Sequence, residues 1–329
     1  MKKQLFRFMP FIVFCILLAI TYNTTHYTVY MPREIHFAGA VKDALYEEIE
    51  EKAEKYERAP QDAKIDPVWK LTPGYNGLKV DVDASYRNMK KKGEFDESKL
   101  IYKQNAPKIH LEDLGASPIY RGHPDKPTVA FAVNVAWGNE YIPTMLEVLK
   151  KHRVKATFFL EGRWAKENTE MAKMIVDAGQ EIGNHSYSHP DMKTLSNERI
   201  KEELTKTNDV IESVTDREVK LFAPPSGSYR DDVVKIAHDL DMHTIMWSVD
   251  TIDWQKPSED VLVSRVMEKV HPGAIVLMHP TKSTASSLDR LIREVKEKGY
   301  DVRDVSTLLN EERPIKTEQL QNKKMKNEH

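Results

Sequence analysis

The sequence has almost no cysteine and almost no net charge. Its single cysteine, Cys15, lies inside an N-terminal apolar run, so the rest of the chain can form no disulfide and must be stabilised by packing alone. Lys and Arg total 49 against 51 for Asp and Glu, a net charge of −2, which provides no overall attraction to nucleic acid. We therefore expect no nucleic-acid partner. With 40% hydrophobic residues, the 329-residue chain can form one large domain and a smaller one.

The N-terminus lacks both a full-length membrane span and a cleavage site. Basic residues precede an apolar run over residues 8–22, which is typical of an export signal. The run is shorter than the roughly 20 residues of a spanning helix, and Pro10 interrupts it. No small-x-small site follows, so we predict that residues 1–24 form a retained signal anchor, with a cleaved signal peptide as the alternative. Both place the protein outside the cytoplasm at a bacterial cell surface, attached to the membrane or secreted.

Residues 30–125 are predicted to form a small α+β module. A highly charged segment over residues 34–59 carries an apolar stripe at four-residue steps, formed by Val41, Leu45, Ile49 and Ala53, and this spacing predicts a helix. Short apolar runs separated by Pro, Gly and Asp follow up to residue 127. No cluster in this region implies chemistry, which favours a spacer or docking module. The polar tail over residues 310–329 has no apolar period and is predicted to be disordered.

Residues 127–309 alternate between strand and helix patterns. The predicted strands span residues 128–135, 155–160, 180–184, 219–222, 244–248 and 274–278. The predicted helices span residues 141–152, 166–178, 197–214, 231–239, 258–270 and 286–298. Regular alternation of this kind predicts an α/β fold with a parallel sheet, most simply a (β/α) barrel.

Chemistry-bearing residues follow several of these strands, where a (β/α) barrel places its sites. His185 and His189 are four residues apart and face the same side of one helical turn or tight loop, which suits one divalent metal ion. Zinc ordinarily needs three or four protein ligands, so the pair requires a third ligand elsewhere. Asn134, Asp253 and His279 follow other strands at the same predicted rim.

Four motifs in order resemble the polysaccharide deacetylase family, also called the NodB-homology or carbohydrate esterase 4 family. They are H-S-Y-S-H, F-A-P-P-S-G, D-T-I-D-W and L-M-H, and the segment K-A-T-F-F-L-E-G also resembles that family. The resemblance covers residues 127–309 and is to the sporulation-associated bacillar type. It implies a distorted (β/α) barrel of the NodB-homology type that removes acetyl groups from N-acetylated sugars of peptidoglycan or chitin.

The resemblance also implies roles for individual residues. Family members hold a divalent metal, most simply zinc, with one Asp and two His, and use a second Asp as general base. By this likeness His185 and His189 are metal ligands, His279 is the general acid and Asp253 orients the site. The remaining matched residues would form the sugar and acetyl pocket: Pro224, Pro225, Trp254 and Leu277.

The first family motif is where this chain differs. The usual T-F-D-D-G aligns with A-V-N-V-A over residues 132–136, so Asn134 replaces the base and Val135 replaces the acidic ligand. An amide is no substitute for a carboxylate base, and a valine has no donor atom for a metal. Ala223 replaces the arginine that would steady the base. We therefore predict weakened metal binding and impaired or absent hydrolysis.

Three functions remain open from the sequence. The first is a deacetylase that borrows a carboxylate as its base, from among Glu140, Glu161 and Asp191. The second is a non-catalytic protein that binds cell-wall polysaccharide on a deacetylase scaffold. The third is a membrane-anchored assembly factor whose protein partners the sequence does not identify. The site residues have structural alternatives too: packed histidines, loop-capping aspartates at 250 and 253, and core tryptophans at 137 and 254.

Overall fold

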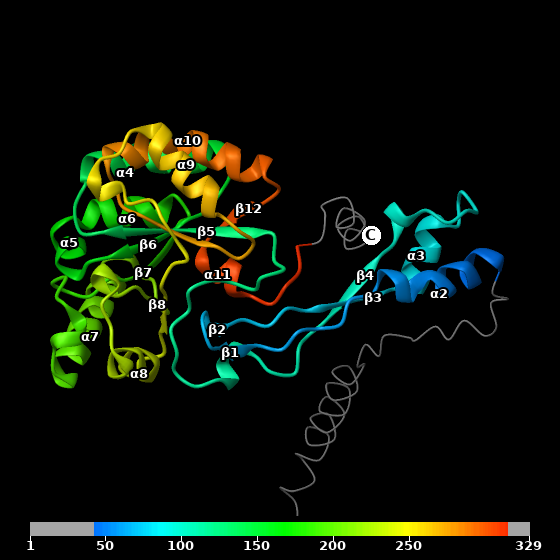
Figure 1. Ribbon diagram of the computed structural model, residues 1–329, viewed down its shortest axis with the longest axis horizontal. Coiled ribbons are helices and arrows are strands. Elements are labelled where there is room, and N and C mark those ends of the chain that lie inside the picture. Colours follow the sequence, from blue (N-terminus) through cyan, green and yellow to red (C-terminus); the bar gives the residue numbers. More distant parts are fainter. Residues whose placement is uncertain (1–42, 315–329) are drawn as a thin grey trace, which may run out of the picture.

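The computed structural model describes residues 43–314 of the chain. A curled parallel sheet covered by helices forms its larger part, and a smaller module precedes it in sequence (Figure 1). Within residues 43–314 no helix is long and apolar enough to cross a membrane. The predicted signal segment over residues 1–24 and most of the predicted tail lie outside the described residues.

The main sheet has eight strands, all paired in parallel, as the alternating pattern predicts. Its order is β10-β11-β5-β6-β7-β8-β9, and β12 pairs with the start of β5. The strands are β5 (Thr128–Val135), β6 (Thr157–Leu160), β7 (Glu181–Asn184), β8 (Leu221–Phe222), β9 (His243–Thr244), β10 (Val249–Asp250), β11 (Ile275–Met278) and β12 (Asp301–Arg303). Every residue of β5 is buried, as expected of a central strand covered on both faces.

Helices cover the outer face of this sheet. They are α4 (Ile142–His152), α5 (Gly162–Glu167), α6 (Thr169–Asp177), α7 (Asn197–Thr215), α8 (Asp231–Asp239), α9 (Glu259–Lys269) and α10 (Lys282–Glu297). The short helix α11 (Val305–Leu309) packs on the inner face instead, in one cluster with Ala130 and Ala132 of β5. The apolar face of α4 packs with Phe131 and Val133 of β5 in one large core cluster. Side chains of Ser196, Ser258 and Thr281 cap the N-termini of α7, α9 and α10.

The two faces of β5 follow the two-residue period of a strand. Val129, Phe131, Val133 and Val135 lie in the cluster that packs against the helices. Ala130 and Ala132 lie in a second cluster on the inner face of the curled sheet, together with Phe159 and Ile275. Asn134 shares the parity of the two alanines, so its side chain belongs to the inner face.

The curled sheet is not closed by pairing of its edge strands. Its edges are β9 and β10, and Ile119 forms a parallel bridge with Ile245 just beyond β9. Arg121 forms an antiparallel bridge with Ala274 just before β11. The segment that precedes the barrel therefore spans the gap between the two edges.

The N-terminal module consists of α2 (Ala44–Tyr56), α3 (Val82–Met89) and two antiparallel pairs of strands. These strands are β1 (Lys64–Asp66) with β2 (Lys70–Thr72), and β3 (Gly77–Val80) with β4 (Tyr102–Asn105). The predicted apolar stripe of the charged helix is confirmed where the structure describes it, because Leu45, Ile49 and Ala53 are buried in a small core of their own. In Figure 1, α2, α3, β3 and β4 lie to the right of the barrel, whereas β1 and β2 lie below it.

Four predicted elements differ in the structure. The predicted helix over residues 166–178 is two helices, because Asn168 leaves helical geometry and its side chain donates to the carbonyl oxygen of Trp164. The predicted strand over residues 244–248 is wrong beyond Thr244, because the chain there crosses from the edge strand β9 to the opposite edge strand β10. The predicted strand over residues 219–222 is shorter, and α10 begins four residues earlier than predicted.

Candidate functional site

A cavity of about 380 Å³ opens at the carboxyl ends of the parallel strands. It is lined by Asn134, Ala136, Trp137, His185, His189, Ser226, Trp247, Asp250, Trp254, Leu277 and His279. Most of the residues predicted from the sequence therefore share one cavity. Pro224 and Pro225 are not among its lining residues, and Ser226, which follows them, takes that place.

The two histidines of the H-S-Y-S-H loop lie close together as neutral rings. His185 is 1% exposed, and its Nδ1–H donates a hydrogen bond to the carbonyl oxygen of Ala223 at 2.7 Å, which leaves Nε2 with a free lone pair. Burial lowers the pKa of His185 to about 3, and burial also lowers the pKa of His189. The ring centroids are 5.1 Å apart. Both rings can therefore offer a lone pair at neutral pH.

A second group of the site is formed by His279, which lines the cavity, and Asp253, which lies behind it and is not among the lining residues. Asp253 is fully buried, and its Oδ1 lies 2.8 Å from Nδ1 of His279. Its Oδ2 accepts hydrogen bonds from the backbone N–H of His279 at 2.6 Å and from the hydroxyl of Thr284 at 2.5 Å. These contacts fix the imidazole with Nδ1–H toward the carboxylate, which is the arrangement that the predicted orienting role of Asp253 requires. The ring of Trp137 stacks on His279 with centroids 6.0 Å apart.

The end of β5 provides no carboxylate to this cavity. Asn134 is 3% exposed and lines the cavity, and its Oδ1 is buried without a hydrogen-bond partner among residues 43–314. Val135 is fully buried in the cluster between the sheet and the helices, on the other face of the strand. The acceptor that would take a proton and the donor that would bind a metal are therefore both missing here.

The residues present do not fit the three-ligand metal site that the resemblance implies. In the described part of the chain, no group of three or more His, Cys, Asp or Glu side chains is placed to hold a metal ion. The carboxylates considered as replacements, those of Glu140, Glu161 and Asp191, do not line the cavity. Glu161 lies in an adjoining hollow of about 390 Å³ that shares Trp137 and His189 with the cavity. The described residues therefore offer no complete ligand set for a catalytic metal ion.

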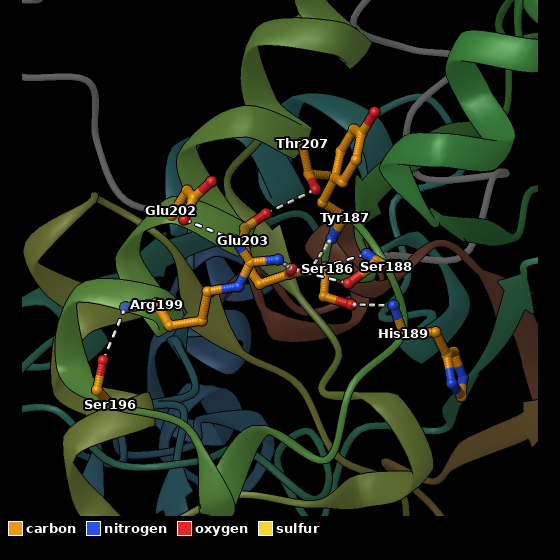
Figure 2. Close-up of polar contacts among 9 residues, drawn as sticks. All are labelled: Ser186, Tyr187, Ser188, His189, Ser196, Arg199, Glu202, Glu203 and Thr207. Atoms are coloured by element: carbon orange, nitrogen blue, oxygen red, sulfur yellow. Dashed lines mark hydrogen bonds and ion pairs between the residues drawn. The ribbon is translucent and has the colours of Figure 1, made fainter.

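Several residues of the site were not predicted from the sequence. Trp247 and Ser226 line the cavity, and Thr284 contacts Asp253 from α10. Ser226 could have been found because it lies within the F-A-P-P-S-G motif. Glu203 contacts the histidine loop from α7, and no motif or spacing marks it (Figure 2).

The curled parallel sheet, with a paired-histidine loop and an Asp-supported histidine around one cavity, defines an α/β scaffold of the carbohydrate-deacetylase class. A family model described as Polysaccharide deacetylase matches residues 121–245. The chain belongs to the polysaccharide deacetylase family. The deacetylases of this family are in general metal-dependent.

Two curated relatives illustrate the range of similarity. The uncharacterized protein YlxY of Bacillus subtilis (strain 168) is 52% identical over 316 residues, which cover 94% of this chain and 99% of the relative. The peptidoglycan-N-acetylmuramic acid deacetylase PdaA of the same organism is 33% identical over 197 residues, which cover 58% of this chain and 75% of PdaA. The similarity to YlxY therefore extends through the N-terminal module.

A solved structure is more similar still in sequence. The wild-type CE4 family pseudoenzyme from Bacillus anthracis is 62% identical, with a TM-score of 0.81, over 83% of this chain and 97% of that one. A mutant of that pseudoenzyme is described as having restored enzymatic activity. The structure of PdaA matches with a TM-score of 0.56 at 32% identity, over 58% of this chain and 84% of that one. The fold is thus shared with a family 4 carbohydrate esterase and with a CE4 family pseudoenzyme.

Proposed function

We propose that this chain is a non-catalytic member of the polysaccharide deacetylase family that binds N-acetylated cell-wall glycan in the cavity at the carboxyl ends of its strands. The proposal rests on one observation: the site has lost two carboxylates and has kept its other groups. Asn134 and Val135 stand where the family has its two carboxylates, yet the paired imidazoles, the supported His279 and the aromatic rim are retained. The similarity to a CE4 family pseudoenzyme supports the non-catalytic part of this proposal.

The chemistry of the site disfavours hydrolysis. Attack of water on an acetamide requires a base to remove a proton, and such a base contributes about 10²–10⁴-fold to the rate. The amide of Asn134 cannot act as that base. The family's metal would polarise the acetyl carbonyl, but Asn134 and Val135 supply no acidic ligand, and residues 43–314 contain no group of three or more His, Cys, Asp or Glu side chains placed to hold a metal ion.

The same cavity has groups suited to binding a sugar. Trp254 and Trp137 are 57% and 48% exposed at its rim, where indole faces can stack on pyranose rings. Leu277 offers an apolar contact for an acetyl methyl group, and His279 offers a fixed polar group for the amide. A buried amide in Asn134 with an unpaired oxygen adds another polar group to the lining.

The proposal extends to a bound metal ion, the cellular location and the biological setting. Two neutral imidazoles can hold one zinc ion with water in its other positions, at lower affinity than a three-ligand site. The relatives that act on peptidoglycan support a place outside the cytoplasm, and residues 1–24 would anchor the protein there. The likeness to bacillar sequences supports a setting in a spore-forming cell.

The test measures binding and hydrolysis in one preparation of the full chain. We expect saturable calorimetric binding of chitotetraose or a peptidoglycan fragment, with acetate release no greater than in a blank without protein. Zinc calorimetry on the chain and on His185→Ala should show weak binding that the substitution removes. Acetate release that disappears in Glu161→Gln would overturn the non-catalytic proposal and assign the base to Glu161. No glycan binding by the chain would remove the binding function.

A further inference from the structure

We propose that Glu203 is a positioning residue for the histidine loop, residues 185–189. Its buried carboxylate holds the backbone of this loop in the one conformation that directs His185 and His189 into the cavity. The geometric part of this inference stands on the contacts alone, and the part that concerns ligand affinity rests on the proposed function.

All backbone N–H groups of the loop have an acceptor. The N–H groups of Tyr187 and Ser188 both donate to Oε2 of Glu203, at 2.9 and 2.8 Å. The other three donate to the carbonyl oxygen of Leu160 (His185, 3.0 Å), to Oδ1 of Asn184 (Ser186, 2.7 Å) and to Oγ of Ser186 (His189, 3.2 Å). One carboxylate oxygen therefore receives two consecutive backbone donors. Both donors lie between the two histidines, so the carboxylate controls the part of the loop that sets their separation.

The conformation held in this way is one that the backbone would not adopt unaided. Ser186 and His189 have φ angles of 61° and 56°, in the left-handed region that residues other than glycine rarely occupy. Such residues persist only where surrounding contacts determine them. Glu203 supplies two of those contacts, and its loss would release the loop toward ordinary backbone angles.

The environment of Glu203 shows that its charge is directed to this loop. The side chain is 1% exposed, and its Oε1 accepts hydrogen bonds from Oγ of Ser188 at 2.8 Å and from Nη2 of Arg199 at 2.8 Å. Three of its four donors thus belong to the loop, as Figure 2 shows. A buried ion pair adds little net stability because desolvation offsets its attraction. Conformational control of the loop accounts for the buried charge better than stability does.

The opposite side of the loop is held by α5. The backbone N–H groups of Gly162 and Arg163 donate to the carbonyl oxygens of Ser186 at 2.8 Å and Tyr187 at 3.0 Å. The loop is therefore held from two sides. Backbone N–H groups at the N-terminus of α5 donate to its carbonyl oxygens, and the Glu203 carboxylate of α7 accepts hydrogen bonds from its N–H groups. In Figure 2 the His189 ring points away from Glu203, so the carboxylate acts through the backbone and not on the imidazole.

The test compares Glu203→Ala and Glu203→Gln with Glu202→Gln in the full chain. Glu202 is the matched control because it lies on the same helix and pairs with Arg199 at 2.7 Å without touching the loop. Hydrogen exchange of the Tyr187 and Ser188 amides should accelerate about tenfold or more in Glu203→Ala, because each loses a hydrogen bond to a charged acceptor. Zinc affinity should fall about 10–100-fold, the usual effect of losing a partner that orients metal ligands. Glu203→Gln should give intermediate values, and Glu202→Gln should match the wild type.

The readouts separate this inference from the proposed function. Amide exchange in β5 reports global unfolding, so acceleration confined to the loop identifies a positioning effect. Unchanged exchange at Tyr187 and Ser188 in Glu203→Ala would overturn the inference, whatever the chain binds. If the wild type binds neither zinc nor chitotetraose, the proposed function fails while the exchange data still decide the role of Glu203. Should Glu203→Ala not fold, the exchange of Glu203→Gln decides it.

Discussion

At the scale of single residues, the function depends on what stands at the end of one strand. Asn134 faces the cavity with an unpaired oxygen, and Val135 faces the helices. Neighbouring residues of a strand point to opposite faces, so the two substitutions alter two different environments. Restoring a metal ligand and a general base at these positions therefore requires two separate substitutions, and their effects on zinc binding and on acetate release can be measured separately.

The first prediction concerns a metal ligand at position 135. Val135→Asp places a carboxylate in a fully buried apolar cluster, which should cost about 3 kcal/mol or more of unfolding free energy. If the strand end can turn that carboxylate toward the imidazoles, added zinc should recover part of the loss. The measurement is Tm with and without zinc. Val133→Asp is the control, because Val133 lies on the same face of β5 one period earlier and should gain nothing from zinc; equal recovery in both variants would refute the prediction.

The second prediction concerns the general base. Asn134→Asp alone should release no acetate, because it supplies a base without an acidic metal ligand. Asn134→Asp combined with Val135→Asp should release acetate from chitooligosaccharide in the presence of zinc, and reverting residue 134 to Asn should lower that rate by about 10²–10⁴-fold. Acetate measured enzymatically over hours decides the outcome. Release by the Asn134→Asp single variant would show that a carboxylate ligand is not needed.

At the scale of elements, the contact between α5 and α7 through the histidine loop leaves no spare volume. A Cβ atom on Gly162 would lie 2.7 Å from Cδ2 of Tyr187 and 2.8 Å from Oγ1 of Thr207. Neither group is the free end of a flexible chain, since Tyr187 is a ring and Thr207 is buried in α7. The glycine is therefore required by close approach of two elements.

Gly162→Ala should accordingly destabilise the protein by about 1–3 kcal/mol, the usual cost of overpacking a close contact. It should also weaken glycan binding, because the displaced Tyr187 belongs to the histidine loop. Urea unfolding and calorimetry measure the two effects. Gly115→Ala is the matched control, since nothing lies within 4 Å of its added Cβ, and it should change neither value. A Gly162→Ala protein as stable as the wild type would contradict this packing argument.

At the scale of the whole molecule, a buried contact joins the segments that precede and follow the barrel. His123 is 4% exposed, and its ring stacks on Tyr75 with centroids 4.7 Å apart. Arg313, which follows the barrel in sequence, lies over the Tyr75 ring, with its guanidinium carbon 3.8 Å from the ring centroid. Residues from before and after the barrel thus meet at one stack of rings.

This junction should make stability sensitive to acid. Burial lowers the pKa of His123 from 6.5 to about 4, so between these values the unfolded chain binds a proton that the folded chain does not. The contribution of this pKa shift to the free energy of unfolding is therefore fully present above pH 6.5. It is lost as the pH falls toward 4, and the loss amounts to about 3 kcal/mol. Urea unfolding at pH 7.5 and pH 4.5 measures the difference. His123→Phe should reduce this difference in unfolding free energy by about 2–3 kcal/mol. The exposed control His238→Gln should leave the difference unchanged. An identical pH dependence in all three proteins would refute the assignment to His123.

Much of this architecture follows from local pattern. The apolar runs and amphipathic repeats predict the parallel sheet and most of its helices, because a strand covered on both faces must be apolar throughout and a covering helix must be apolar on one side. The ordered motifs predict which residues meet in the cavity, and the placement of His185, His189 and His279 agrees with them. The errors lie where local pattern is overridden, at Asn168 and in the crossing after Thr244.

By itself the sequence determined the family, the strand and helix order, and the absence of the two carboxylates at Asn134 and Val135, since each of these depends on residue identity along the chain. The tertiary structure alone decided that Val135 faces the helices, that Ile119 and Arg121 bridge to the two sides of the open sheet and that Glu203 bonds to the histidine loop. These features arise from contacts between segments distant in sequence. The free energy of such contacts depends on packing in three dimensions, which no local pattern records.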